Sequence, residues 1–363
     1  MKTIDIASIL AQFEITGSVI EVKPLGNGLI NDTYRAVTAG SDTPDYVLQR
    51  INNAVFKDVE LLQRNIEVVT AHIRHKLVAS GADDIDRKVL SFIKSHDGKT
   101  YYCDELGRYW RVMVYIPGSV THEAVTPESA YTAGKAFGDF ERMLVDVPVA
   151  LGETIPDFHN MELRLRQLRE AVRGNAARRL DEVRDIVSEL ERDADEMCQA
   201  ERLYREGRLP KRICHCDTKV NNMLFDENGQ VLCVIDLDTV MPSFVFSDYG
   251  DFLRTGANLT AEDDPDLSRV GFNQGIFKSF TAGYLELARS FLTPLEISCL
   301  PYAVALFPFM QCARFLTDYL NGDTYYKIKY PTHNLDRTRN QLALYRDVRR
   351  HDAMMASYIS ALL

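Results

Sequence analysis

Residues 212–240 read RICHCDTKVNNMLFDENGQVLCVIDLDTV, and this stretch carries the strongest structural signal of the chain. A short apolar segment leads into a polar loop, and the turn Glu227-Asn228-Gly229 leads into a second apolar segment, Val231–Ile235. Apolar segments separated by an Asn-Gly turn are typical of short paired strands. The stretch therefore predicts a small β island that delivers Asp217 and Asp236 from adjacent strand ends.

The polar residues of this island match the requirements of phosphoryl transfer from a nucleotide. That reaction needs a carboxylate to receive the proton of the acceptor hydroxyl, hard oxygen ligands for Mg²⁺, and a cation near the transferred phosphoryl group. Asp217 fits the first role and Lys219 the third. Asn222 and Asp236 fit the second. We expect His215 to organise the loop backbone and not to act as the base.

Two other interpretations of the island remain open. Cys214-His215-Cys216 has metal-ligating residues, although it lacks Cys-x-x-Cys spacing and a second pair of ligands. The string VIDLDTV also has the form of an aspartyl-phosphate phosphatase strand, with Asp236 as nucleophile and Asp238 as acid/base. That fold needs several parallel strands after the nucleophile, whereas the residues that follow here read as helices.

The chain before the island reads as strands with one long helix. The predicted strands are Val19–Leu25, Thr33–Thr38, Tyr46–Ile51, Lys88–Lys94, Thr100–Cys103 and Trp110–Ile116, and Phe56–Val78 has apolar residues at helical spacing. Ile116-Pro117-Gly118-Ser119 breaks the pattern. Most of the chain beyond it reads as helix, beginning with Pro127–Leu144 and continuing through the highly charged Leu163–Arg208.

We therefore predict an α+β protein of two lobes. Residues 1–116 would form a small antiparallel β lobe with one long helix, and residues 117–363 a large, mostly helical lobe. A length of 363 residues allows each lobe a core of its own.

Composition limits the classes of partner. Lys and Arg number 42 against 52 Asp and Glu, for a formal charge of −10, so no basic surplus is present for nucleic acid. No apolar run approaches the roughly 20 residues of a membrane span, and the N-terminus lacks a signal-peptide pattern. The seven cysteines, an odd number, indicate free thiols in a reducing compartment. We expect a cytoplasmic protein without nucleic-acid or membrane partners, either a monomer or a weak homodimer.

The first lobe offers candidate nucleotide contacts. The string LGNGLINDTYRAV places Gly26, Asn27 and Gly28 in a turn that leads into β-branched residues and not into a helix, which argues against a Rossmann loop. The turn could cover nucleotide phosphates or be a plain hairpin turn. Gln49 and Arg50 on the third strand could reach the phosphates, but an exposed strand arginine is an equally good interpretation of Arg50.

Together these residues resemble the protein-kinase-like fold, specifically its aminoglycoside/choline phosphotransferase branch. His215–Asn222 matches the catalytic loop His-x-Asp-x-x-x-x-Asn, and Ile235-Asp236 matches the metal-binding aspartate that follows it. GNGLINDTY, YVLQRIN, WRVMVYIPGS, HCDTKVNNMLFD, IDLDTVMP and ARFLTDYLNGDTYYK are similar to the signatures of N-acetylhexosamine 1-kinases. The resemblance implies transfer of phosphate from ATP, with Mg²⁺, to the anomeric hydroxyl of N-acetylglucosamine or N-acetylgalactosamine.

The resemblance also implies a role for each matching residue. Asp217 would be the catalytic base, and Lys219 would stabilise charge on the γ-phosphate. Asn222 and Asp236 would hold Mg²⁺. Adenine would lie against the backbone of the hinge strand, from Val114 to Ile116.

The sequence departs from the kinase pattern at two positions. The strand lysine is missing, and Arg50, or else Gln49, stands in its place, with Glu60 as a candidate partner for Arg50. Leu29 occupies a position in the glycine turn where the family would have a polar histidine. Asp248 and Asp251 in SDYGDFLR are expected to stabilise the catalytic loop.

Sugar recognition is assigned by the resemblance to Arg314 and Tyr325 in the helical lobe. An alternative for Arg314 is an ion pair with Asp318, four residues later on the same helix. Alternatives for the whole protein are a kinase of the same fold that acts on choline, homoserine, methylthioribose or an aminoglycoside, and a catalytically silent nucleotide-binding module.

Overall fold

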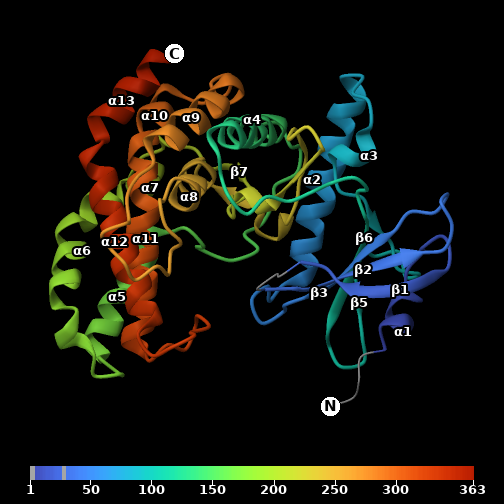
Figure 1. Ribbon diagram of the computed structural model, residues 1–363, viewed down its shortest axis with the longest axis horizontal. Coiled ribbons are helices and arrows are strands. Elements are labelled where there is room, and N and C mark those ends of the chain that lie inside the picture. The colour runs from blue at the N-terminus through green and yellow to red at the C-terminus, as the bar shows by residue number, and fades with distance from the viewer. Residues whose placement is uncertain (1–4, 27–29) are drawn as a thin grey trace. The chain divides into compact units, whose positions relative to one another are not determined.

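The computed structural model describes residues 5–26 and 30–363 of the chain (Figure 1). Asn27, Gly28 and Leu29 of the predicted glycine turn lie outside the described residues. The chain divides into two compact units. Unit 1 contains the residues up to Thr121 together with 146–156 and 223–241, and unit 2 contains 122–145, 157–222 and 242–363.

Unit 1 is built on an antiparallel sheet with the strand order β1-β2-β3-β6-β4, and β5 also pairs with β6. The strands are β1 (Val19–Pro24), β2 (Asp32–Thr38), β3 (Tyr46–Ile51), β4 (Phe92–Ile93), β5 (Tyr102–Cys103) and β6 (Tyr109–Val114). Alternate residues of the central strands form an apolar core with helix α1 (Ile6–Leu10), in which Leu48, Trp110 and Val112 are completely buried. Five of the six predicted strands are confirmed, with small shifts at their ends.

The predicted strand Lys88–Lys94 is wrong in its first half. Ile85–Lys88 forms the short helix α3, and only Phe92–Ile93 pairs with the sheet. Val89 and Leu90 are buried without pairing, and burial alone accounts for their apolar character. A short apolar run cannot by itself distinguish a strand from a buried connection.

The long helix α2 (Val59–Ala79) begins where the Asp58 side chain accepts a hydrogen bond from the Leu61 backbone N–H at 2.9 Å. Its apolar residues at the predicted spacing are buried, among them Leu62, Ile66 and Val69. Gln63 and Asn65 are buried on the same helix, although they are polar. Buried polar side chains need hydrogen-bond partners, and these two lead to the candidate site.

Unit 1 also takes in part of the β island. Strands β8 (Met223–Phe225) and β9 (Val231–Val234) form an antiparallel hairpin. Val120 pairs with Phe225 through two backbone hydrogen bonds of 2.9 and 2.8 Å. The sequence predicted a single division of the chain, at residue 116. In the structure, unit 1 also includes two later segments, 146–156 and 223–241, and the second of these contains the hairpin that pairs with Val120.

Unit 2 is mainly helical (Figure 1). Its helices are α4 (Pro127–Met143), α5 (Met161–Gly174), α6 (Arg184–Met197), α7 (Gln199–Arg205), α8 (Phe246–Gly256), α9 (Gln274–Ala288), α10 (Pro294–Ser298), α11 (Leu300–Asn321), α12 (His333–Arg350) and α13 (Asp352–Ala361), and strand β7 (Arg212–Cys214) pairs with β10 (Met241–Ser243). Helix α4 begins as predicted, with Pro127 in its first turn and a capping box between Thr126 and Ser129. The charged stretch Leu163–Arg208 is helical, as predicted, and contains most of α5 together with α6 and α7; α5 ends where Asn175 adopts a left-handed conformation.

Two further predictions from composition can be compared with the structure. All seven cysteines are free thiols, as predicted. Within residues 5–26 and 30–363, none of the helices has both the length and the apolar character that crossing a bilayer requires.

Helices α4 and α9 pack against each other through glycines. A Cβ atom added to Gly283 of α9 would lie 2.0 Å from the backbone oxygen of Tyr131 on α4. In the other direction, Cβ atoms on Gly134 and Gly138 of α4 would lie 2.1 and 2.6 Å from the backbone oxygens of Phe280 and Tyr284. The two backbones therefore approach each other so closely that no larger side chain fits between them.

We expect Gly283→Ala to lower the free energy of unfolding by about 1–3 kcal/mol, because the methyl group overlaps a backbone atom that cannot rotate away. Denaturant titration measures the change. Gly174→Ala, at the last residue of α5, is the matched control, since no heavy atom lies within 4 Å of its added Cβ. Equal losses in the two variants would contradict the proposed close contact.

Candidate active site

In unit 2, a single carboxylate holds the loop that follows β7. The two oxygens of Asp248, on α8, accept hydrogen bonds from the backbone N–H groups of His215 and Cys216 at 2.8 and 2.7 Å. The Asp248 carbonyl accepts a third bond, from Thr218 Oγ1 at 2.7 Å. Asp248 has the loop-supporting contacts that the sequence predicts, whereas Asp251 forms an ion pair of 2.9 Å with Arg254.

His215 is completely buried and organises the loop, as predicted. Its Nδ1 accepts a hydrogen bond from the Asp217 backbone N–H at 3.3 Å. Phe137 and Phe140 of α4 contact the ring edge-on, with centroid distances of 5.8 and 5.9 Å. Cys216, between His215 and Asp217, has a φ of +63°, a conformation that costs a non-glycine residue of the order of 1–3 kcal/mol. The surrounding contacts must therefore hold the loop in this shape.

The structure brings together three of the predicted site residues, Asp217, Lys219 and Asn222. Lys219 Nζ lies 3.0 Å from Asp217 Oδ2. Asn222 Nδ2 donates to the Asp217 backbone oxygen at 2.7 Å and to Asp217 Oδ2 at 3.2 Å. Because the amide nitrogen of Asn222 faces Asp217, its amide oxygen is the atom left for a metal ion.

The fourth residue predicted to take part in the chemistry, Asp236, belongs to unit 1. Its side chain is exposed, and its backbone has a φ of +60° at the end of the β8–β9 hairpin. The residues that follow it are held by hydrogen bonds. Asp238 is buried, and its carbonyl accepts a hydrogen bond from Thr154 Oγ1 at 2.9 Å. The Val240 carbonyl accepts one from Asn65 Nδ2 at 3.0 Å. The position of Asp236 in unit 1 is therefore fixed through its neighbours.

A buried ion pair is the centre of this anchor. Arg111 Nη1 lies 2.5 Å from Asp238 Oδ1, and both side chains are only 2% exposed. Asn31 Nδ2 donates to the other Asp238 oxygen at 2.7 Å. Arg111 also donates to Gln63 Oε1 at 3.2 Å and, through two nitrogens, to Gln49 Oε1 at 3.0 and 2.8 Å. A set of buried polar groups thus joins β3, β6, α2 and the segment after Asp236.

The two candidate phosphate contacts on β3 have partners inside unit 1. Gln49 accepts from Arg111 and donates to Thr33 Oγ1 at 3.1 Å, so it supports the buried arginine. Arg50 forms an ion pair with Asp32 on the neighbouring strand. The suggested partner Glu60 is wrong, because Asp32 lies directly opposite Arg50 in the sheet.

Three other predicted nucleotide contacts remain predictions. Gly26 is exposed with a φ of +71°, as a turn glycine should be. The Val114 N–H already donates to the Ser91 carbonyl at 2.9 Å, and the Ile116 carbonyl accepts from Ser119 Oγ at 2.7 Å. Only the remaining backbone groups of Val114 and Ile116 are left for adenine.

Unit 2 contains a cluster of arginines and rings that we call the arginine–aromatic cluster. Its members are Phe158, His159, Arg164, Arg314 and Tyr326. The Arg314 guanidinium lies 5.5 Å from the Phe158 centroid and 5.7 Å from the Tyr326 centroid. Arg164 donates to the Phe158 carbonyl at 2.5 Å, and the His159 ring stacks on the Phe158 ring at 4.3 Å. Two guanidinium groups therefore meet around one aromatic residue.

The arginines of this cluster have few acidic neighbours, of which Asp157 acts on Arg164 from a distance. Within residues 122–145, 157–222 and 242–363, neither Arg164 nor Arg314 has a carboxylate at ion-pair distance. Arg314 donates to Gln311 Oε1 at 3.0 Å and Arg164 to Gln167 Oε1 at 3.0 Å. Burial, together with the charge of Arg314, lowers the pKa of Arg164 to about 10. Burial and the nearby arginines hold the pKa of His159 well below its usual range, so His159 is neutral at pH 7.

A short chain of contacts connects this cluster to the catalytic loop. His159 Nδ1 lies 3.0 Å from Ser247 Oγ on α8. The residue after Ser247 is Asp248, whose carboxylate accepts the backbone N–H groups of His215 and Cys216. The cluster therefore contacts the same helix, α8, that holds the loop after β7.

The two residues predicted to bind sugar differ in exposure. Arg314 belongs to the arginine–aromatic cluster. Tyr325, in the loop after α11, is 69% exposed, and its ring contacts the Tyr326 ring of the cluster with centroids 4.7 Å apart. The alternative ion pair of Arg314 with Asp318 is wrong. The Asp318 carboxylate is buried and accepts the backbone N–H groups of Thr324, Tyr325 and Tyr326 at 2.8–2.9 Å, and so shapes this loop.

The two other interpretations of the β island do not fit the structure. The phosphatase alternative fails because the main sheet is antiparallel and Asp238, its proposed acid/base, is held by Arg111. A metal site in Cys214-His215-Cys216 is not supported either, because the Cys214 thiol donates to the Phe244 carbonyl at 3.3 Å while His215 Nδ1 accepts the Asp217 N–H.

Sequence reasoning missed Arg111 and Arg164, and it considered Asp238 only as the acid/base of the phosphatase alternative and not as a buried anchor. A signal was present for Arg111, which is the only charged residue of the otherwise apolar segment WRVMVYI and so needs a buried partner. Nothing local distinguishes Arg164 from the other arginines of its highly charged helix.

Comparisons with known proteins agree with this geometry. Residues 21–278 match the sequence model of a phosphotransferase enzyme family. The fold is similar to that of an aminoglycoside phosphotransferase from Alicyclobacillus acidocaldarius, with a TM-score of 0.63, 15% identity, and coverage of 99% of this chain and 98% of that one.

Two kinases with small-molecule acceptors have a similar fold. An amicoumacin kinase, solved with AMP-PNP, Ca²⁺ and its antibiotic, has a TM-score of 0.59 and 13% identity, and the match covers 93% of this chain and 92% of that one. A choline kinase from Cryptosporidium parvum has a TM-score of 0.58 and 13% identity, and the match covers 96% of this chain and 95% of that one. These matches confirm the predicted protein-kinase-like α+β fold, with an antiparallel sheet and a larger helical part.

We expect Asp238→Asn to lower the free energy of unfolding by roughly 3–5 kcal/mol, because the substitution leaves the Arg111 charge buried and uncompensated. Asp32→Asn is the matched control. It removes the carboxylate from the half-exposed pair with Arg50, and we expect a loss below about 1 kcal/mol. Chemical unfolding followed by circular dichroism compares the two. A loss from Asp238→Asn no larger than that of the control would show that the buried pair does not anchor this segment.

Proposed function

The chain belongs to the phosphotransferase enzyme family, and from this premise we propose that it is an ATP- and Mg²⁺-dependent kinase that phosphorylates the anomeric hydroxyl of N-acetylhexosamines. The observation that carries the choice of acceptor is the arginine–aromatic cluster. Its two guanidinium groups have no carboxylate at ion-pair distance within unit 2, and its His159 hydrogen-bonds to Ser247, the residue before Asp248 on α8.

The two residues that the resemblance assigns to the metal, one in each unit, have donor atoms that suit a divalent cation. The Asn222 amide oxygen and the Asp236 carboxylate are hard oxygen ligands of the kind that Mg²⁺ takes in phosphate-binding sites. When bound, Mg²⁺ neutralises charge on the phosphates of the nucleotide. The similar amicoumacin kinase was solved with an ATP analogue and Ca²⁺, which supports a nucleotide and a divalent cation as ligands here.

Asp217 is the residue that we assign to the acceptor hydroxyl. Its carboxylate orients the hydroxyl and receives the proton as the oxygen attacks the γ-phosphate. Lys219 and Asn222 hold this carboxylate in place, and Lys219 also offsets the negative charge of the transferred group. Because the transition state of phosphoryl transfer is loose, most of the rate enhancement comes from this positioning and from electrostatics.

The charge of the cluster favours a neutral acceptor that is rich in oxygen. A guanidinium group has five N–H donors in one plane, which suits hydroxyl and carbonyl oxygens such as those of an N-acetylated sugar. Choline and aminoglycosides are cations, and Arg164 and Arg314 would repel them. The rings of Phe158 and Tyr326 that could bind a cation are already in contact with Arg314.

The product identifies the reaction directly. Purified protein is incubated with Mg·ATP and, in separate reactions, N-acetylglucosamine, N-acetylgalactosamine, choline, homoserine, methylthioribose and an aminoglycoside. We expect the phosphorus NMR spectrum of the hexosamine products to show a sugar 1-phosphate. Transfer only to an amine or to a different hydroxyl would refute the proposed acceptor while leaving the phosphotransferase assignment in place.

We expect Asp217→Asn to reduce kcat by about 10²–10⁴-fold, because the amide can neither accept the proton nor carry the orienting charge. ATP binding, measured by calorimetry, should change little. Asp195→Asn, a surface carboxylate with a side chain 94% exposed, is the control and should leave kcat unchanged. Near-normal turnover by Asp217→Asn would mean that another group is the base.

We expect Arg164→Gln and Arg314→Gln each to raise KM for the hexosamine by about 10–100-fold, since each removes charge-assisted hydrogen bonds to acceptor oxygens. KM for ATP should stay within twofold of wild type. Arg173→Gln, at an exposed position on the same helix as Arg164, controls for general loss of charge. Unchanged KM values in both cluster variants would exclude this cluster as the acceptor site.

A further inference from the structure

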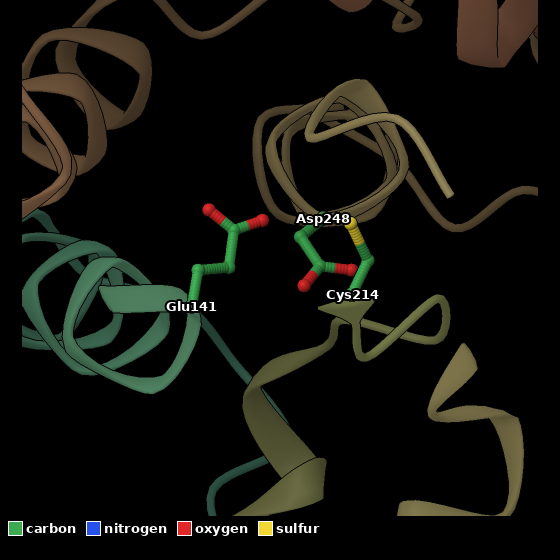
Figure 2. Close-up of side chains that lie close together, drawn as sticks. All are labelled: Glu141, Cys214 and Asp248. Atoms are coloured by element: carbon green, nitrogen blue, oxygen red, sulfur yellow. The ribbon is translucent and has the colours of Figure 1, made fainter. Parts of the chain in front are cut away.

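Three titratable side chains of unit 2 meet in the protein interior beneath the catalytic loop. Glu141 from α4, Cys214 from β7 and Asp248 from α8 point toward one another, with their reactive atoms within 4.8 Å (Figure 2). Glu141 is 2% exposed, and the other two are completely buried. Asp248 is the residue that fixes the catalytic loop, so the environment of its carboxylate bears on the loop directly.

The hydrogen bonds of the two carboxyl groups differ. Both oxygens of Asp248 accept backbone N–H groups, from His215 and Cys216. Glu141 accepts one hydrogen bond, from Tyr284 Oη to Oε2 at 2.5 Å. No group of the described chain donates to Glu141 Oε1, which is buried beside Asp248.

Two ionised carboxylates cannot share this space. Water is excluded, the two charges repel each other, and each charge would carry the desolvation cost of a buried ion. One proton between the groups removes the repulsion and turns the orphaned oxygen of Glu141 into a donor. Asp248 has the two backbone donors that stabilise a charge, so the proton belongs on Glu141.

We propose that Glu141 is a positioning residue: it stays protonated and donates its carboxyl O–H to Asp248, which in turn holds the catalytic loop. Only the activity part of this proposal rests on the proposed function, since the hydrogen bond itself is a property of the folded chain. The glycine contact between α4 and α9 sets the position of Glu141, because Gly138, one turn before it, lies against the backbone of Tyr284.

The pKa shifts of the two acids agree with this assignment. Burial, followed by the charge of Asp248, raises the pKa of Glu141 well above its usual range. Burial also raises the pKa of Asp248, but His215 and the two backbone N–H groups act in the opposite direction. The hydrogen bond between the acids raises the pKa of Glu141 and lowers that of Asp248, as expected if Glu141 is the donor.

Other titratable groups surround Glu141, and the cation among them, Arg212, interacts with Glu141 but is itself paired with Glu296. They are Tyr284 on α9, Cys214, His215 and Cys216 at the end of β7, and Arg212, which is paired with Glu296 of α10 at 2.6 Å. Burial raises the pKa of Cys214 and Cys216 well above their usual range, so both remain neutral thiols.

The proposal predicts whether the folded state becomes more or less stable as the pH rises. In the unfolded chain Glu141 loses its proton near its ordinary pKa, whereas in the folded chain it keeps it, so raising the pH favours unfolding. The stabilisation is complete below the ordinary pKa and is lost progressively as the pH rises toward the raised pKa of the folded state. A glutamine at this position cannot titrate, yet it keeps one donor for Asp248 and one acceptor for Tyr284.

The test compares Glu141→Gln, Glu141→Ala and wild type from pH 5 to 8.5, by chemical unfolding and by kcat. Relative to Glu141→Gln, the unfolding constant of wild type should rise by up to about tenfold per pH unit, the value for one linked proton. Groups that titrate in both proteins, such as Glu201 with its pKa raised to about 7, cancel in this comparison. Glu128→Gln, at an exposed position in the first turn of α4, is the matched control and should keep the wild-type slope.

We expect Glu141→Gln to keep kcat within about twofold of wild type, and Glu141→Ala, which leaves Asp248 without this donor, to lose about tenfold or more. The proposal would be wrong, and Glu141 ionised, if Glu141→Gln lost as much activity as the alanine variant. It would also be wrong if the unfolding constant of Glu141→Gln changed with pH as steeply as that of wild type. The pH dependence of the unfolding constant is measured without substrate. Failure of every acceptor would therefore refute the proposed function alone, whereas an unchanged slope would refute the proposal for Glu141 alone.

Discussion

The hydrogen bonds from the backbone of His215 and Cys216 to the Asp248 carboxylate determine the shape of the catalytic loop. The loop includes a left-handed cysteine, a conformation that would relax without an external restraint. With that restraint, Asp217 projects from the loop, and Lys219 and Asn222 meet its carboxylate. The side chains that carry the chemistry are partly accessible, whereas the acid that holds them is completely buried.

Unit 1 uses a similar arrangement for the other metal-ligand candidate. Asp236 is exposed, and Asp238, two residues later, is buried and paired with Arg111. In both units an accessible acid is held in position by a buried acid with several hydrogen bonds. Buried polar groups of this kind are costly unless every partner is present, so they make the position of the site sensitive to single substitutions.

The sequence allowed prediction of the features that depend on local spacing. Asp217, Lys219 and Asn222 lie within six residues of each other, so their meeting follows from one loop. The Arg111–Asp238 pair joins residues that are far apart in the chain, and no local pattern links them. The same limit applies to the hydrogen bonds between Gln49 and Arg111, whereas the predicted nucleotide contact of Gln49 stays a prediction. The end of α5 at Asn175 was not predicted, although the pair Gly174-Asn175 is typical of helix ends.

The positive φ of Asp236 affects how substitutions at this position should be interpreted. Aspartate and asparagine are among the few residues other than glycine that adopt this backbone conformation readily. Alanine would remove the carboxylate and also strain the turn, so a loss of activity in that variant would combine two effects. Asparagine retains the turn and removes only the charge, and glycine retains the turn and removes the side chain. These two substitutions therefore separate the conformational role of residue 236 from its role as a ligand.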